Sequence, residues 1–510
     1  MQRPEADARE WLLTWSGSAL PDPAFHPVLA ELDDLGERER ALGIGRDAPV
    51  LIASDGSCDP RLCEFLASPH FARLSSSTKK SYAADLRMWL EYLDTRGKSW
   101  SEASPQDVNT YWLWRSRSDL NEHSVSGSKA NRELAAISLL YRWASHRTRG
   151  HIEFNPVERE SLGPARSGSG HRNGVPVRSR NVVAERVKWV TPRTFRLWRK
   201  VGIEGYTLDD LRGTSFKGRN ALRNKAMMEM LFSSGLRITE GASLLTLELP
   251  SCDRHAVGLN EARLAAAIAK GRHPRTWYLF NDALAIVNSY MTTTRRVSVD
   301  RAKRHKRYEN ADRILVTDTR LTADGMKLKY SGRWRRPDDI DIADRRRLLL
   351  DTGDGPEPLW LWLSEAGMPL PVSAWTDVMS DANDRVFDAF KEIRPGGVVK
   401  PGSRAPRLSP HSLRHSFALY MLIALHRAID VQNGSTGSTG YHEERYRMAW
   451  ETVRDLLGHR HETTTRERYL APLNGVRLRS LIGRGDLQRA LSGLAGLDPR
   501  VLDVAQAGNG

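Results

Sequence analysis

Hydrophobic side chains recur every three to four residues in the first third of the chain, with polar residues between them. One stripe follows the spacing i, i+4, i+7, i+8 and i+11, and it consists of Tyr82, Leu86, Trp89, Leu90 and Leu93. A second stripe consists of Leu134, Ile137, Leu140, Tyr141 and Ala144. Because an α-helix turns once in about 3.6 residues, this spacing predicts amphipathic helices that share a core. We therefore expect a small all-helical domain over residues 58–158.

The composition changes after this domain. A stretch rich in Gly, Ser and Arg follows, which is typical of a flexible basic linker. Thr191 and Pro192 then provide a cap and a first-turn proline, so a second domain is expected to begin there. The predicted divisions are an extension of unknown role at 1–57, the helical domain at 58–158, the linker at 159–190, the second domain at 191–485 with inserts near 293–355 and 431–447, and a tail at 486–510.

Length and composition favour a soluble, folded protein. The 510 residues suffice for about three domains, and 40% apolar with 27% charged residues is ordinary for globular proteins. The chain has no run of about 18 apolar residues, and the start Met1–Asp7 lacks the apolar segment of a secretory signal. Its cysteines, Cys58, Cys63 and Cys252, are too few for a disulfide framework and lack the spacing of a zinc site. We expect a cytoplasmic protein without a membrane span.

The charge of the chain points to a polyanionic partner. Lys and Arg number 77 against 62 Asp and Glu, which gives a formal net charge of +15. The excess is uneven, because residues 295–347 carry 17 Lys/Arg and 9 Asp/Glu, a net of +8. Neutralising phosphates releases condensed counterions, so such a basic cluster favours nucleic-acid binding. A disordered basic insert would have the same composition, and that alternative stays open at this point.

Three separated segments combine residues whose local structure suits an anion site. In the first, a predicted helix ends at Gly235, a residue suited to a left-handed cap, and Arg237 follows in the turn. The next predicted helix carries Glu240, whose carboxylate would orient that arginine. Alone, this pattern favours an ordinary arginine in a surface turn.

The second segment predicts a helix that begins at a capping pair, Ser409 and Pro410. His411 and Arg414 stand three residues apart in its first turn, so they project from neighbouring positions. The free N–H groups and the helix dipole at such an end favour an anion.

In the third segment a predicted helix ends at Gly458, and His459 follows. Thr464 and Glu467 have the spacing of a capping box, which would place Tyr469 in the first turns of a short helix. A tyrosine directly after two arginines, Arg466 and Arg468, is unusual core material, although it is also compatible with an ordinary amphipathic position.

Together these segments resemble the catalytic boxes of the tyrosine recombinases, or phage-integrase family. The matching stretches occur in the family's order and are Ser234–Glu240, His411–Ala418 and Leu456–His459 with Tyr469. The helical domain is similar to the family's core-binding, SAM-like domain, so the resemblance covers roughly residues 58 to 485. It implies a mainly helical α+β fold, in which an all-helical core-binding domain and a mixed α/β catalytic domain form a clamp on DNA.

The resemblance also implies a role for each residue type. Tyr469 would attack the scissile phosphodiester and form a 3′-phosphotyrosine, while His411 would accept the phenol proton. Arg237 and Arg414 would bind the non-bridging oxygens, and His459 would donate a hydrogen bond to the phosphate. No metal or other cofactor is expected, because fixed cations can take the place of magnesium.

A lysine on a β-hairpin completes the family's set. The stretch Ala267–Trp277 resembles that hairpin, and its Lys270 would protonate the leaving 5′ oxygen. A contact of Lys270 with the DNA backbone alone is the other interpretation. Glu240 and His415 are expected to support the catalytic residues.

The partner that the resemblance implies is double-stranded DNA. The predicted DNA contacts are basic residues of the helical domain and of the hairpin, namely Lys79, Lys80, Arg87, Lys129, Arg132 and Arg272. A homotetramer on two paired sites, with the tail docked on a neighbour, and an accessory DNA-bending factor are further implied, in the bacterial nucleoid. The predicted function is a site-specific recombinase or integrase. The alternatives are a type IB topoisomerase, which would use nearly the same residues, and a catalytically silent DNA-binding accessory protein.

Overall fold

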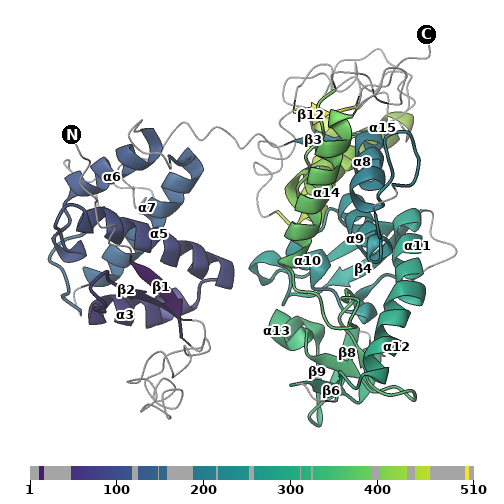
Figure 1. Cartoon of the computed structure of the whole chain (residues 1–510), viewed down its shortest axis with the longest axis horizontal. Coiled ribbons are helices and arrows are strands. Elements are labelled where there is room, and N and C mark those ends of the chain that lie inside the picture. The colour runs from purple at the N-terminus through teal and green to yellow at the C-terminus, as the bar shows by residue number, and fades with distance from the viewer. Residues whose placement is uncertain are drawn as a thin grey trace. The chain divides into compact units, whose positions relative to one another are not determined.

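The computed structural model divides the chain into two compact units, Met1–Glu185 and Arg186–Gly510, each with its own hydrophobic core (Figure 1). The residues that the structure describes are 11–16, 48–117, 124–146, 149–157, 188–213, 216–251, 258–309, 312–322, 325–392, 399, 403–432, 443–459 and 500–504. Tyr469 and the stretch 158–187 lie outside the described residues, as does most of the predicted tail.

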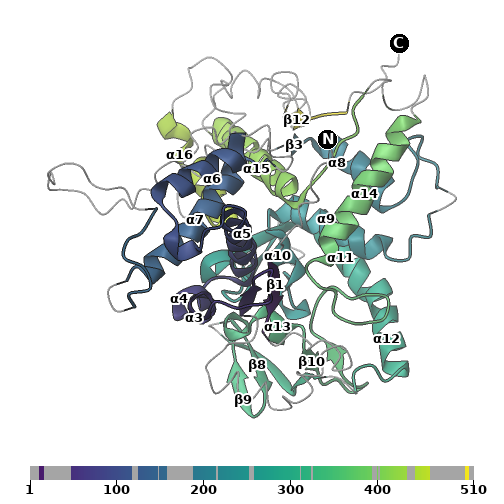
Figure 2. The ribbon, with the colours of Figure 1, turned by 60° about the vertical axis from the view of Figure 1, so that its left-hand side comes forward.

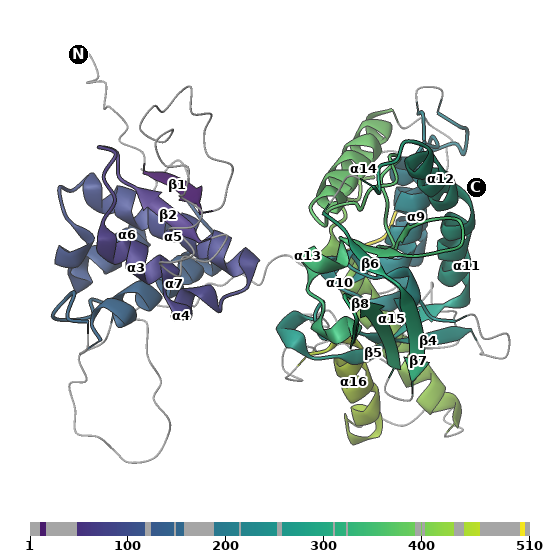
Figure 3. The same cartoon turned by 90° about the horizontal axis from the view of Figure 1, so that it is seen from below.

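The first unit is a helical core that carries a two-stranded sheet. Its helices are α3 (Pro60–Ala67), α4 (Pro69–Ala72), α5 (Ser76–Asp94), α6 (Pro105–Arg117) and α7 (Gly127–Ala144). The helices predicted from the two apolar stripes are confirmed as α5 and α7. Strands β1 (Leu12–Trp15) and β2 (Pro49–Ile52) pair antiparallel and contact α5 (Figure 3). Part of the segment 1–57 therefore belongs to this unit.

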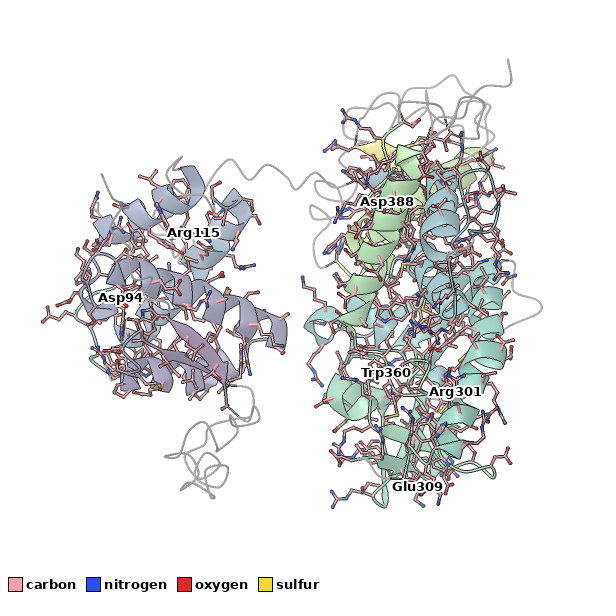
Figure 4. All side chains as sticks on the ribbon, viewed as in Figure 1. Asp94, Arg115, Arg301, Glu309, Trp360 and Asp388 are labelled. Atoms are coloured by element: carbon pink, nitrogen blue, oxygen red, sulfur yellow. The ribbon has the colours of Figure 1, made fainter. Side chains whose placement is uncertain are left out.

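Buried aromatic and charged groups join α5, α6 and α7. The indole of Trp89 donates to the Tyr141 hydroxyl at 3.1 Å, which donates to the Trp100 carbonyl at 2.7 Å. Nearby, the guanidinium of Arg115, which is labelled in Figure 4, donates to the buried carboxylate of Glu133 at 2.9 and 2.7 Å. Such a pair is tolerated in a core because hydrogen bonds replace the water that both groups lose.

The second unit packs helices around short strands. Its helices are α8 (Pro192–Trp198), α9 (Ala221–Ser234), α10 (Ile238–Ala242), α11 (Asn281–Tyr290), α12 (Arg296–Arg304), α13 (Ile342–Arg345), α14 (Ala374–Lys391), α15 (Pro410–Gln432) and α16 (Glu443–Leu457). Its strands are β3 (Trp189–Val190), β4 (Leu259–Leu264), β5 (Arg275–Phe280), β6 (Ile314–Val316), β7 (Asp318–Thr322), β8 (Gly325–Tyr330), β9 (Arg333–Arg335), β10 (Leu348–Leu350), β11 (Glu357–Pro358) and β12 (Val501–Leu502). The predicted fold class, mainly helical α+β, is confirmed.

Tryptophans fill the middle of the second unit. Those that are at most 1% exposed include Trp198, Trp277, Trp360, Trp362 and Trp375. The indole of Trp362 donates to the Gly241 carbonyl at 2.8 Å, and that of Trp198 donates to Asn383 at 2.9 Å. The core is thereby tied directly to α10, the short helix that carries Glu240.

The basic stretch predicted as an insert at 293–355 is folded into this core. It forms α12, β6 to β10 and α13, and its Val316, Leu328 and Leu348 are fully buried. Strand β8 lies between β7 and β9 in an antiparallel sheet. In a second, mixed sheet β10 pairs in parallel with β6 and antiparallel with β11. For its described residues, the alternative of a disordered basic insert is therefore wrong.

A buried ion pair fixes this insert to the segment that follows α10. Arg345, which has no exposed surface, donates to both carboxylate oxygens of Glu248 at 2.7 and 2.9 Å. It also donates to the carbonyl oxygens of Ile340, Pro337 and Ser243 at 3.0, 2.7 and 3.3 Å. Ser243 is the C-cap of α10, so the insert holds the end of that helix in place.

The last described residues return to the start of the second unit. Strand β12 pairs in parallel with β3, and the Thr191 hydroxyl donates to Asp503 at 2.6 Å. Figures 1 and 2 show these strands at one end of the unit and β8 and β9 at the opposite end. Residues 500–504 thus contact their own unit, and docking of the tail on a neighbour stays a prediction. None of the helices in the described ranges is long and apolar enough to span a membrane.

Candidate active site

The first predicted box folds as a sharp corner between two helices. Helix α9 ends at Gly235, whose φ of +64° lies in the left-handed region that favours glycine. A Cβ atom at Gly235 would come within 2.3 Å of the Phe417 ring on α15. Because the two elements approach so closely, the Gly235 carbonyl accepts a hydrogen bond from Arg414 of α15. The glycine thus permits both the turn and the contact between the two boxes.

Glu240 fixes Arg237 at the beginning of α10. Its carboxylate accepts from the backbone N–H of Arg237 at 2.9 Å and from the Arg237 guanidinium at 2.8 Å. This satisfies one of the free N–H groups at the helix start and orients the side chain at the same time. The expected supporting role of Glu240 therefore has a geometric basis, in a side chain that is only 1% exposed.

Two further arginines reach the same carboxylate. Arg275, at the beginning of β5, donates to both oxygens of Glu240 at 3.1 and 2.7 Å. Arg414 lies 3.9 Å from it. Burial alone would raise the pKa of Glu240, but its hydrogen bonds to Arg275 and the charges of Arg275, Arg414 and Arg237 lower that pKa to about 2. We call Arg237, Arg275 and Arg414 the arginine cluster; with one carboxylate among three guanidinium groups, it keeps a surplus of positive charge.

Arg414 connects all three boxes. It lies in the first turn of α15 and is 1% exposed, and it donates to the carbonyl oxygens of Gly235 and of Leu457. Its Nη2 also lies 3.4 Å from Nε2 of His459. A guanidinium carries five N–H donors in a planar fork, so it can hold this corner and still present donors to an anion.

His459 follows directly after α16. Gly458, with φ of +61°, turns the chain, and the His459 backbone N–H donates to the Arg454 carbonyl at 3.1 Å. Burial, reinforced by the charges of Arg414 and Arg237, lowers the pKa of His459 to about 3. The imidazole is therefore neutral at pH 7, a form in which one ring nitrogen donates a hydrogen bond.

The other predicted residues lie on the elements that carry this group, namely α15 and the β4–β5 hairpin. His411 is exposed in the first turn of α15, and its ring centroid lies 6.3 Å from that of the buried His415, which contacts Trp189 edge-on. Lys270 is exposed in the connection between β4 and β5; within the described residues, no hydrogen bond or ion pair links it to the arginine cluster. Arg272 is exposed beside it. No described group of three or more His, Cys, Asp or Glu has the arrangement of a metal site.

Comparisons with known proteins agree with the family resemblance and with the helical unit. Residues 70–148 match the model of the phage integrase N-terminal SAM-like domain. The chain is 21% identical over 217 residues to the tyrosine recombinase XerC of Leptospira interrogans, and 25% identical over 202 residues to XerD of Ralstonia nicotianae. The chain is thus similar in sequence to tyrosine recombinases, and its residues 70–148 match a domain model of the phage integrases.

The extent of these matches is limited to part of each protein. The match to XerC covers 42% of this chain and 56% of the relative, and the match to XerD covers 40% and 51%. The chain thus spans about half the length of the curated tyrosine recombinases it matches. Among solved structures, the XerH recombinase bound to palindromic difH is 11% identical with a TM-score of 0.40, over 87% of this chain and 85% of that one. The Tn1549 transposon integrase in complex with transposon right-end DNA is 14% identical with a TM-score of 0.35, over 80% and 96%.

Arg275 is the site residue that sequence reasoning did not single out. On β5 it alternates with Trp277 and Leu279, which are buried, so the strand period places it on the inward face. An arginine at an inward strand position needs a buried hydrogen-bonding partner. The inward position of Arg275 in the strand pattern could therefore have identified it as a site residue. The partner, Glu240, lies on α10, and only the folded structure brings the two together.

The predicted DNA contacts of the helical unit differ in exposure and in whether they form ion pairs with acidic residues. Lys80, Lys129 and Arg132 are exposed, while Lys79 and Arg87 are half-buried. Arg132 donates to Asp85 at 2.8 and 2.9 Å. Lys129 lies 3.9 Å from the Glu133 carboxylate, and Arg87 lies 3.6 Å from that of Glu91. Among the five, Lys79 and Lys80 have no ion pair within the described residues, so they present the least compensated charge.

Proposed function

We propose that this chain is a site-specific DNA recombinase that cuts and rejoins duplex DNA without metal or ATP. The observation that carries the proposal is the arginine cluster around Glu240. It fixes two guanidinium groups from separate boxes beside a neutral histidine, and it keeps a surplus of positive charge. A phosphodiester in transfer accumulates negative charge on its non-bridging oxygens, and preorganised cations stabilise that charge.

In the proposed reaction, Arg237 and Arg414 bind the non-bridging oxygens of the scissile phosphate. His459, whose pKa is lowered to about 3, donates a hydrogen bond to the phosphate as a neutral imidazole. The phenol oxygen of Tyr469 attacks phosphorus, a bond forms between them, and the bond from phosphorus to the 5′ oxygen breaks. His411 takes the phenol proton, and Lys270 gives a proton to the leaving 5′ oxygen.

Rejoining reverses these steps with a different strand. The 5′-hydroxyl of the incoming strand attacks the phosphotyrosine, its proton passes to Lys270, and Tyr469 recovers its proton from His411. Bond energy is conserved in the phosphotyrosine, so no cofactor has to supply it. We further propose that four subunits act on two paired sites in the bacterial nucleoid, with an accessory DNA-bending factor where the sites require one.

A covalent-trapping assay tests the proposal. The wild type and Tyr469→Phe are incubated in EDTA with nicked duplexes taken from the ends of the DNA element that encodes the protein, then separated on a denaturing gel. We expect an adduct with the wild type alone, joined through a 3′ phosphate. If bound DNA gives no adduct, the chain is the catalytically silent DNA-binding protein instead.

A second assay separates recombination from strand relaxation. A supercoiled plasmid with one site is compared with a mixture of two labelled duplexes, each with one site. A recombinase joins strands between the two duplexes. A type IB topoisomerase relaxes the plasmid with no exchange between duplexes. The match of residues 70–148 to the integrase SAM-like domain supports the first outcome.

A further inference from the structure

The sheet β7–β8–β9 of the insert has two different faces. On β8, Leu328 and Tyr330 are buried in the core of the second unit and Met326 packs against it. Because side chains alternate across a strand, Lys327 and Lys329 point to the opposite face. Most of that face is therefore turned away from the core.

Cations occupy this outer face on two strands, and an aromatic ring lies on the third. Arg320 of β7 stands directly opposite Lys327, and Lys329 stands opposite Trp334 of β9. The Arg320 guanidinium and the Lys329 ammonium lie 5.7 and 6.0 Å from the centroid of the Trp334 ring, which is 39% exposed. We call Arg320, Lys327, Lys329 and Trp334 the outer basic face.

This arrangement lowers the stability of the protein when no anion is bound to it. Like charges directly opposite one another on neighbouring strands repel, and Arg320 and Lys327 are such a pair. The acid within these three strands, Asp318, lies on the same face directly opposite Lys329, and its carboxylate accepts from the Thr319 backbone N–H at 2.8 Å. Among the described residues, no ion pair involves Arg320, Lys327 or Lys329. Three cations and one carboxylate therefore occupy this face, and its positive charge is only partly compensated within the described fold.

The insert is also held rigidly to the candidate active site. Arg345, which follows this sheet in the chain, binds Glu248 and the C-cap of α10. The same α10 carries Glu240, which organises the arginine cluster. A polyanion bound to both places would thus meet two surfaces at a fixed separation.

We propose that the outer basic face is a second DNA-binding surface, which contacts the phosphate backbone of duplex DNA beyond the scissile phosphate. The inference rests on the proposed function, because it takes duplex DNA as the substrate. Lys327 and Lys329 are two residues apart on one strand, hence about 7 Å apart, and Arg320 lies on the neighbouring strand about 5 Å away. The major groove, which is about 12 Å wide, admits two β-strands side by side, so β7 and β8 can lie in it while phosphates on its rim meet the cations.

A variant with the outer charges removed tests this surface. In the full-length protein, Arg320→Gln, Lys327→Gln and Lys329→Gln are combined. The control combines Lys391→Gln, Arg427→Gln and Arg447→Gln, which removes the same charge from exposed positions on α14, α15 and α16. Binding of a fluorescein-labelled duplex is measured by anisotropy at increasing salt. We expect the sheet variant to bind roughly tenfold or more weakly at low salt, and its slope of log affinity against log salt to fall by about 2 to 3.

The wild type supplies a test that no folding defect can disturb. Lysine acetylation is followed by mass spectrometry with and without the duplex, and Lys327 and Lys329 should be protected while Lys391 is not. If wild-type protein binds DNA but these lysines react equally in both conditions, the surface does not contact DNA, and the proposed function is unaffected. An equal loss of affinity in the control variant rejects the surface too. If the wild type binds no duplex at all, the proposed function fails with it.

Discussion

The guanidinium of Arg275 contacts both carboxylate oxygens of Glu240, at 3.1 and 2.7 Å, from a strand that begins 35 residues later in the chain. The same guanidinium donates to the Leu456 carbonyl at 3.3 Å, next to the end of α16. One side chain from the hairpin thus joins the first box to the third. Arg275 acts in our scheme as a positioning residue, because it holds Glu240 and through it Arg237.

Replacement of Arg275 should impair catalysis more than folding. In Arg275→Lys a single ammonium cannot hold both carboxylate oxygens and the Leu456 carbonyl, so Arg237 loses its fixed position. We expect covalent-adduct formation to slow on the order of 100-fold, as displacement of a reacting group by about 1 Å does in other enzymes. The rate is measured on the nicked duplex in a single turnover.

The hairpin offers a matched control for this change. Arg263 on β4 pairs with Asp338 at the surface, with half of its side chain exposed, and Arg263→Lys should keep the wild-type rate. A normal rate in Arg275→Lys, with both variants folded by circular dichroism, would mean that Glu240 and Arg237 do not depend on Arg275.

What the sequence predicted well depends on local periodicity and capping. The apolar stripes gave α5 and α7, Gly235 has the left-handed φ that its place after a helix predicts, and α15 begins at Pro410. These features involve residues within a few positions of one another. The proximity of Arg237, Arg414 and His459 could be expected only through the family resemblance, because nothing local fixes how three distant helix ends meet.

The features of the structure that the sequence did not predict depend on contacts between segments distant in the chain. The partner of Arg345, Glu248, lies 97 residues earlier, and no local pattern connects them. The fold of the insert was missed for the same reason, since its buried Val316, Leu328 and Leu348 sit on short strands within a basic composition. Tyr469 lies outside the described residues, so its catalytic role stays a proposal.

Gly235→Ala should destabilise the corner between α9 and α10. A left-handed φ costs a residue with a Cβ about 1–2 kcal/mol, and the Cβ would meet the Phe417 ring at 2.3 Å. Overpacking adds about 1–3 kcal/mol. Gly332 is the matched control, because its φ is +72° but nothing lies within 4 Å of its added Cβ. Urea unfolding should therefore show a larger loss of unfolding free energy for Gly235→Ala than for Gly332→Ala, and equal losses would contradict the contact with Phe417.

Removal of the Arg345 guanidinium should be among the most damaging single changes in the second unit. Arg345→Met leaves the buried carboxylate of Glu248 without its partner, and such a change costs about 3–5 kcal/mol. The double variant Arg345→Met/Glu248→Leu also removes the unpaired carboxylate and should recover most of the lost unfolding free energy. Calorimetry measures both, with Arg347→Met as the control, since Arg347 makes its ion pairs at the surface. A double variant as unstable as the single one would show that the carboxylate is not the source of the loss.

Acid should destabilise the fold through two histidines before it affects Glu240. Burial lowers the pKa of His426, which has no exposed surface and stacks on Tyr446, from 6.5 to about 4, and burial with nearby arginines lowers that of His459 to about 3. Above pH 6.5 both states hold a neutral imidazole and stability does not depend on it. As the pH falls below 6.5, each of these histidines becomes protonated in the unfolded chain but stays neutral in the folded chain. The free energy of unfolding therefore declines. Glu240, with its pKa lowered from 4.5 to about 2, adds its own loss only as the pH falls below 4.5.

His426→Phe isolates one of these contributions, because a phenyl ring can keep the stacking on Tyr446 and has no proton to bind. A single histidine of this kind changes stability by at most about 1.4 kcal/mol for each pH unit. Between pH 6.5 and pH 5, which is above the range where Glu240 acts, we expect the variant to lose roughly half as much unfolding free energy as the wild type. The measurement is urea unfolding at stepped pH values across this window. Parallel curves for the two proteins would show that His426 binds a proton equally well in the folded chain, and hence that its burial next to Tyr446 does not disfavour the charged form.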